Sequence, residues 1–252
     1  MAKPTNLHPD DDMHWITWIV CIAGAYLIGS LPFGVLLARA RGIDIRAHGS
    51  KNIGATNVAR VLGRTWGTIC FFLDVMKGAA PVLVAGFVCG VVNRHPNGAE
   101  EPLTQTEMWL WLAVAVAVVA GHMFSIFLGF SGGKGVATGF GAMTAMWPLL
   151  TIPALGALVV WYAVLRLFRY VSLASMAAVV SLPVGYLLAA LPAREVDDLP
   201  HHLLRASPPL IVTAVLAIVV VYKHRANITR LRRGEEPKIG GSARRGDVLT
   251  DE

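Results

Sequence analysis

Long stretches without charged side chains divide this chain of 252 residues into apolar segments. Each segment holds 17 to 31 residues, and only the second contains charged side chains, those of Asp74 and Lys77. The segments are residues 13–38, 65–93, 108–133, 135–165, 170–193 and 206–222. About 20 apolar residues are enough for a helix to cross a bilayer, and a chain in lipid must satisfy its backbone hydrogen bonds internally. The pattern therefore predicts an all-α, polytopic integral membrane protein.

The fourth segment, residues 135–165, is long enough for one helix or for two short helices that break near Pro148. The distribution of Lys and Arg decides between these alternatives, because cytoplasmic loops carry an excess of positive charge. If the segment crosses twice, 17 of the 22 Lys and Arg residues fall on one side and four on the other, with Lys77 inside a span. We therefore predict about seven transmembrane helices, an external N-terminus and a cytoplasmic C-terminus, with spans four and five short.

The same division sets the predicted domain organisation. Residues 1–14 form an external N-terminal segment, residues 15–233 form a single membrane-embedded domain, and residues 234–252 form a cytoplasmic polar tail. The first apolar segment is too long for the core of a signal peptide and is interpreted as a retained span.

Composition agrees with this class of protein and excludes several others. Apolar side chains make up 55% of the chain and charged ones only 15%, which excludes a disordered chain or a coiled coil. The three cysteines all lie in apolar segments without paired spacing, so they predict neither a disulfide framework nor a zinc site. The net charge of +6 reflects the basic cytoplasmic face, which suits membrane lipid and anionic substrates rather than nucleic acid.

The first inner loop, residues 48–60, combines glycines, hydroxyls and side-chain amides with the cations Lys51 and Arg60, and it has no carboxylate. Backbone amides exposed at glycine turns, together with an arginine, suit a phosphate or a carboxylate. A polar turn that carries only topological charge is an equally good interpretation of this loop taken alone.

Within the second segment, Asp74 and Lys77 stand three residues apart and therefore share a helical face on which they can pair. Ionisable groups inside a span are costly and usually face a cavity, which favours a functional role. The alternative is a structural ion pair that locks two helices together.

A third element surrounds Lys134 with Gly132, Gly133 and Gly135 and continues into helix-forming residues. This pattern indicates an anion-binding nest at a helix N-terminus. The alternative is a flexible hairpin with one topological lysine.

The last element follows the seventh predicted span, where His224 and Asn227 are three residues apart and share a helical face. Taken alone, this basic stretch is better explained as a stop-transfer tail that binds anionic lipid. The inner face has few carboxylates, so we predict no metal site and no cofactor.

In this order, the four elements resemble those of the bacterial acyl-phosphate:glycerol-3-phosphate acyltransferases. The resemblance rests on residues 29–34, 49–60, 72–78, 121–138, 170–175 and 224–234. It implies a seven-helix enzyme of the bacterial inner membrane whose active site faces the cytoplasm. Such an enzyme transfers a fatty acyl group from acyl phosphate to the 1-hydroxyl of sn-glycerol 3-phosphate, which gives lysophosphatidic acid and phosphate for phospholipid synthesis.

The resemblance also implies the residues of the site. The expected catalytic residues are Ser50, Arg60, Lys134, His224 and Asn227. The expected substrate-binding residues are Gly49, Asn52, Thr56, Asn57, Lys77, Gly132, Gly133, Gly135, Thr138 and Ser172.

Two other functions fit much of the same pattern. A transporter of phosphorylated metabolites also needs spans and basic loops, although it often has two similar halves and no such repeat is visible here. An acyltransferase that uses acyl-CoA or acyl carrier protein would share the acceptor site.

Overall fold

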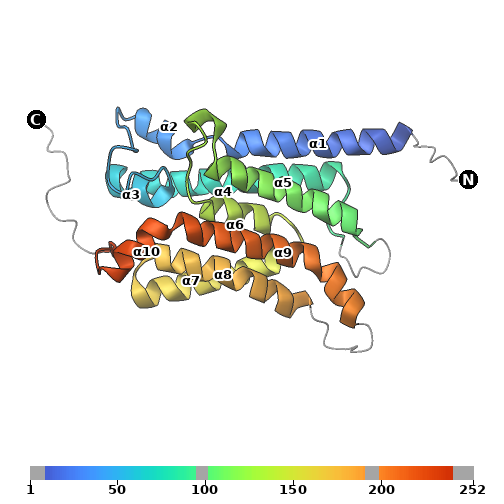
Figure 1. The fold of residues 1–252 in the computed structure, drawn as a ribbon. Helices are drawn as coiled ribbons and strands as arrows, with labels where there is room; N and C mark the ends of the chain where they lie inside the picture. Colours follow the sequence, from blue (N-terminus) through green and yellow to red (C-terminus); the bar gives the residue numbers. More distant parts are fainter. Residues whose placement is uncertain (1–8, 95–101, 191–198, 241–252) are drawn as a thin grey trace, which may run out of the picture.

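The computed structural model describes residues 9–94, 102–190 and 199–240, and the regular secondary structure within these ranges is entirely helical (Figure 1). The helices are α1 (Pro9–Gly29), α2 (Phe33–Arg39), α3 (Ala55–Leu62), α4 (Arg64–Val88), α5 (Gln105–Met123), the short 3₁₀ helix η1 (Ile126–Leu128), α6 (Val136–Thr144), α7 (Thr151–Phe168), α8 (Val171–Ala190), α9 (Leu199–Lys223) and α10 (Arg225–Arg232). The predicted all-α fold class is confirmed.

Six helical segments in these described ranges are long and apolar enough to cross a membrane. The fourth predicted span is the exception, because α6 has nine residues and a length of about 14 Å, roughly half of a bilayer's apolar core. The 31-residue segment does divide in two, since α6 ends at Thr144 and α7 begins at Thr151. The break includes Pro148, near which the sequence predicted it.

Two groups of long helices enclose α6 (Figure 1). One group consists of α1, α4 and α5, and the other of α7, α8 and α9. Glycines allow the close approach of α6 to α4, because a Cβ atom on Gly78 would lie 2.1 Å from the Thr138 carbonyl oxygen. Small residues at such crossings are typical of helix packing in membranes.

The surface of the bundle is apolar where lipid would cover it. Large apolar side chains remain exposed along the helices, for example Val20 of α1, Phe87 of α4 and Val159 of α7. A protein in water rarely exposes so continuous an apolar surface, so these side chains agree with a multi-pass membrane protein.

The short helices α2, α3 and α10 gather at one end of the bundle, opposite the end at which α1 begins (Figure 1). This end carries the loop before α3, the loop before α6 and the segment after α9, which are the stretches singled out in the sequence. The predicted membrane orientation and the domain limits at residues 14 and 233 stay predictions.

Candidate functional site

A direct contact joins two of the predicted elements. The ammonium of Lys134, in the loop before α6, donates a hydrogen bond of 2.5 Å to Oδ1 of Asn227 on α10. These residues are 93 positions apart in the chain. The fold therefore places the glycine-rich loop and the basic C-terminal stretch at one site.

Glu236 is a central residue of this site that sequence reasoning did not assign. Its Oε1 accepts hydrogen bonds of 2.7 Å from Asn227 Nδ2 and from Ser172 Oγ, while its Oε2 accepts one of 2.7 Å from Arg230 Nε. Ser172, an expected site residue, is thus brought to Asn227 through this carboxylate. We define Lys134, Ser172, Asn227, Arg230 and Glu236 as the charged cluster.

A sequence signal for Glu236 did exist. Gly234 follows α10 with a left-handed φ of 71°, and its N–H donates to the Leu231 carbonyl. Glycine in this position ends helices and reverses the chain. The reversal returns residue 236 to the helix that it follows, so the first part of the predicted polar tail packs on the site.

The charged cluster shifts the ionisation of its members. The pKa of Lys134 is lowered to about 8, chiefly by burial. The charge of Glu236 opposes this shift, whereas the charges of Arg230 and Arg60 add to it. Burial would raise the pKa of Glu236, but its three hydrogen bonds hold that pKa below its ordinary value. The cluster therefore contains a firmly ionised carboxylate and a lysine that titrates closer to neutrality than usual.

Arg60 comes to the same charges from α3. Partial desolvation by the surrounding chain lowers the pKa of Arg60, and the charge of Glu236 acts in the opposite direction. Arg60 as a whole remains exposed.

His224 immediately precedes α10 and is buried, with 2% of its surface exposed. Its Nδ1 lies 2.8 Å from the Val220 carbonyl oxygen. A carbonyl only accepts, so Nδ1 carries the proton and Nε2 keeps its lone pair. Burial and the charge of Lys134 lower the pKa of His224 to about 4, which leaves the imidazole neutral at physiological pH.

Asn57 organises the first inner loop. Its Oδ1 accepts a hydrogen bond of 2.8 Å from the Ser50 N–H, and its Nδ2 donates to the carbonyls of Ile45 and His48. A Cβ atom on Gly49 would lie 2.4 Å from Asn57 Oδ1, and Gly49 has a left-handed φ of 58°. The side-chain amide of Asn57 is thus fully engaged with the loop backbone, and Gly49 leaves room for it. Three other expected site residues of this loop are more open, since Ser50 and Thr56 are exposed and Asn52 is half-buried.

The glycine-rich loop is held tightly against the end of α5. The Gly133 N–H donates a hydrogen bond of 3.0 Å to the His122 carbonyl, and a Cβ atom on Gly132 would lie 2.1 Å from that same oxygen. Gly135 has a left-handed φ of 79° and leads directly into α6, as the sequence predicted. Thr138 is fully buried, and its Oγ1 lies 3.1 Å from His122 Nδ1.

Lys77 lies in a separate group of contacts. Its Nζ is 2.8 Å from Asp74 Oδ1, which confirms the predicted pairing, and it donates a hydrogen bond of 2.7 Å to the Leu31 carbonyl. The contacts found for Lys77 are therefore structural ones within the bundle rather than contacts with the charged cluster.

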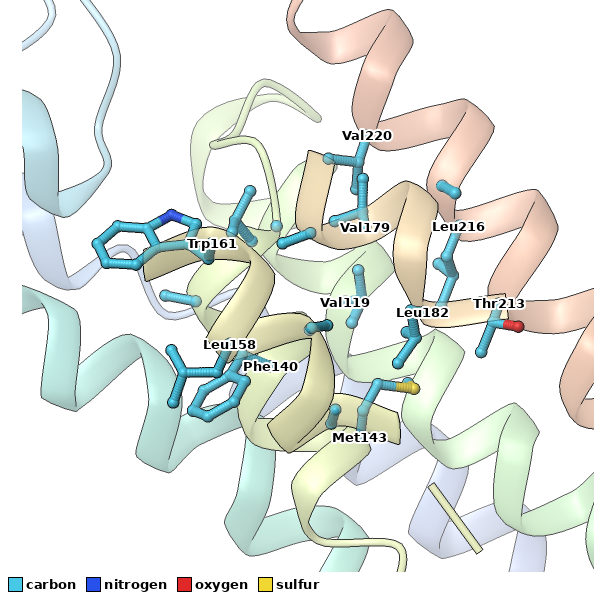
Figure 2. Close-up of a pocket in the computed structure, with 18 of the residues that line it drawn as sticks. Val119, Phe140, Met143, Leu158, Trp161, Val179, Leu182, Thr213, Leu216 and Val220 are labelled. Atoms are coloured by element: carbon cyan, nitrogen blue, oxygen red, sulfur yellow. The ribbon is translucent and has the colours of Figure 1, made fainter. Parts of the chain in front are cut away.

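An apolar cavity of about 120 Å³ extends between the helices (Figure 2). Residues from α4 to α9 line it, among them Val119, Phe140, Leu158, Leu182 and Val220. Its wall includes Gly135 and Val136, the two residues that follow Lys134 in the chain. A ligand bound here would have an apolar part between the helices and a polar part at the cluster.

Within the described ranges, no group of three His, Cys, Asp or Glu side chains is arranged to hold a metal ion. Apart from the carboxylate of Glu236, the polar groups of the site are amides, hydroxyls and cations, which bind oxyanions.

Comparison with known proteins shows a consistent similarity over most of the chain. The family model described as glycerol-3-phosphate acyltransferase matches residues 19–234. Proteins named glycerol-3-phosphate acyltransferase from Geobacter sulfurreducens and Aquifex aeolicus are 42% and 37% identical, over 88% and 85% of this chain and 97% and 95% of their own lengths.

Solved structures give the same result. The crystal structure of PlsY, an integral membrane glycerol 3-phosphate acyltransferase, in its glycerol 3-phosphate form superposes with a TM-score of 0.71 at 35% identity. The match covers 88% of this chain and 96% of that one. The lysophosphatidic acid form of that enzyme superposes with a TM-score of 0.69.

Proposed function

This chain belongs to the glycerol-3-phosphate acyltransferase family, and on this basis we propose that it transfers a fatty acyl group from acyl phosphate to the 1-hydroxyl of sn-glycerol 3-phosphate. The products are lysophosphatidic acid and inorganic phosphate, and the enzyme serves phospholipid synthesis.

One observation supports this function best, namely that the charged cluster borders an apolar cavity. Lys134 belongs to the cluster, and the next two residues line the cavity. Acyl phosphate likewise has a charged end and an apolar end, because its phosphate is bonded to the reactive carbonyl and a long alkyl chain extends from the other side of that carbonyl. We propose that the cavity takes the alkyl chain and that the cluster takes the phosphate.

Phosphate binding would fall to Arg60 and Lys134, because charge-assisted hydrogen bonds to phosphate are stronger than neutral ones. The side chain of Ser50, which is exposed, is available to the acceptor phosphate. Asn227 would orient glycerol 3-phosphate beside Lys134, and Nε2 of His224 would accept a hydrogen bond from the acceptor hydroxyl. Holding both substrates in this way converts a bimolecular encounter into a reaction between aligned groups.

The chemical step follows from the activated donor. The oxygen of the 1-hydroxyl attacks the acyl carbonyl carbon, the bond from that carbon to the phosphate oxygen breaks, and phosphate leaves with the bonding electrons. The hydroxyl proton goes to a phosphate oxygen. His224 serves for orientation because an imidazole with a pKa near 4 is a weak base at neutral pH.

We expect the purified protein in detergent to release phosphate and lysophosphatidic acid when it receives glycerol 3-phosphate and acyl phosphate. The three donors acyl phosphate, acyl-CoA and acyl carrier protein are offered separately, and product is measured by mass spectrometry. Turnover with acyl-CoA alone would replace the proposed donor. Failure with every donor would overturn the acyltransferase proposal and leave a transporter.

The same assay tests the absence of a metal requirement. We expect the rate to be unchanged in an excess of EDTA, because the donor is already activated and the inner face of the site has few carboxylates. A loss of activity that magnesium restores would contradict this prediction.

The proposed location is the bacterial inner membrane with the site facing the cytoplasm. In a variant without native cysteines, single cysteines at Ser50 and Ser131 should react with an impermeant maleimide only after the membrane is opened. A cysteine at Asn97 should react in intact spheroplasts. Reaction of the Ser50 position in intact spheroplasts would reverse the proposed orientation.

The pH dependence of kcat/KM should show the ionisation of Lys134. Protonated Lys134 binds phosphate, and its pKa is about 8, so kcat/KM should be level just below pH 8 and fall about tenfold per unit well above it. An unperturbed lysine would place this fall above about pH 10. The residual activity of Lys134→Met should lack the fall near pH 8, and a fall that persists in that variant would assign it to another group.

A further inference from the structure

A second group of polar side chains lies inside the bundle, away from the charged cluster. Its members are Asp74 and Lys77 of α4, His122 of α5 and Thr138 of α6, and each exposes 5% of its surface or less. Ionisable groups inside a membrane are costly, so their presence needs an explanation. The proposed reaction uses none of these four side chains directly.

Two direct contacts lie within this group. Asp74 Oδ1 is 2.8 Å from Lys77 Nζ, and Thr138 Oγ1 is 3.1 Å from His122 Nδ1. The two contacts adjoin, because Asp74 Oδ1 lies 3.7 Å from His122 Nδ1, which is beyond hydrogen-bond distance. Lys77 also donates to the Leu31 carbonyl in the break between α1 and α2. The group thus ties four segments of the chain together at one point.

His122 connects this group to the glycine-rich loop. Its carbonyl accepts the Gly133 N–H at 3.0 Å, and its imidazole edge packs directly on the same glycine. A Cβ atom on Gly133 would lie 2.2 Å from His122 Nε2. The loop therefore rests on both the backbone and the ring of His122, and Lys134 is the next residue.

We infer that Asp74, Lys77, His122 and Thr138 form a positioning network that fixes the glycine-rich loop and, through it, the ammonium of Lys134. This inference rests on the proposed function. His122 is the residue that transmits the constraint, while Thr138 holds its ring by a hydrogen bond and the buried Asp74–Lys77 pair packs beside that ring. Lys77 acts here as a positioning residue and not as a substrate ligand, because its ammonium already binds Asp74 and Leu31.

A double-mutant cycle between His122 and Lys134 tests the inference. If His122 acts through Lys134, His122→Ala should lower kcat/KM about 100-fold in the native background, the effect expected when a reacting group is misplaced by about 1 Å. In the Lys134→Met background the same change should lower kcat/KM by less than about threefold, because coupled residues are not additive. An equal loss in both backgrounds would overturn the inference.

Two variants of Thr138 distinguish its hydroxyl from its methyl group. Thr138→Val removes the hydroxyl that faces His122 and should lower kcat/KM. Thr138→Ser keeps a hydroxyl there and should have a higher kcat/KM than Thr138→Val. Ser181→Ala removes a hydroxyl from a spanning helix outside the network and should leave kcat/KM within about twofold of the native value. Equal activity of Thr138→Val and Thr138→Ser would remove Thr138 from the network.

Hydrogen exchange separates this inference from the proposed function, because it needs no substrate. His122→Ala should speed exchange of the amides at residues 132–135 at least tenfold, with no comparable change in α7. This result would support the network even if the native protein transferred no acyl group. Unchanged exchange in the loop would overturn the network even in an active enzyme.

Discussion

Replacement of Lys134 by methionine is expected to lower kcat/KM by roughly 10- to 150-fold. Methionine keeps the length and the helix propensity of lysine, but it removes the charge that bonds to Asn227. Loss of a charge-assisted hydrogen bond is worth roughly 1.5–3 kcal/mol, which converts to this range if the charge acts in the transition state. Steady-state kinetics with both substrates varied measure the effect, and unchanged thermal unfolding in detergent would show that the protein still folds.

Lys51→Met is the matched control for this prediction. Lys51 is an exposed cation of the first inner loop, so it carries the same topological charge without a place in the charged cluster. We expect its kcat/KM to stay within about twofold of the native value. If both lysine variants were equally impaired, or if Lys134→Met turned over normally, Lys134 would be a topological charge only.

The membrane spans could be predicted because lipid imposes a simple rule on the sequence. Charge-free segments marked the long helices, and the distribution of Lys and Arg divided residues 135–165 correctly into α6 and α7. The length of α6 was harder to predict from the sequence. The segments on either side of α6 are apolar too, and hydropathy does not distinguish a helix from irregular backbone. Only the glycines and Pro148 indicated the limits of this helix.

The candidate site was predictable in its parts and not in its connections. Each loop carries residue types that suit a phosphate, although topology alone explains the first loop equally well and the C-terminal stretch better. The contact of Lys134 with Asn227 depends on how distant segments pack. Glu236 was overlooked because a single carboxylate in a polar tail carries no pattern of its own. Its role depends on the chain reversal at Gly234, which brings it to three donors at once.

Local pattern alone does not distinguish side chains that the fold engages from side chains that it leaves exposed. Asn57 and Thr138 have the side chains of a phosphate site, yet Asn57 binds the backbone of its own loop and Thr138 is buried against His122. Sequence alone gives both groups the same signal, and burial and hydrogen-bond partners distinguish them.

The strongest test of the loop's shape is Gly132→Ala. The added methyl group would lie 2.1 Å from the His122 carbonyl oxygen and 2.8 Å from the Met123 carbonyl oxygen, so backbone must move to admit it. Because Lys134 is two residues away, we expect kcat/KM to fall about 100-fold, as for a displaced catalytic group.

Gly156→Ala is the control for this change, since no atom lies within 4 Å of its would-be Cβ on the surface of α7. There, alanine should leave activity intact and favour the helix by up to about 1 kcal/mol. Steady-state kinetics and thermal unfolding of the two variants compare the same substitution at a crowded and at an open position. If Gly132→Ala were as active as Gly156→Ala, the glycine-rich loop would tolerate displacement. The position of Lys134 would then not depend on the contact between this loop and the end of α5.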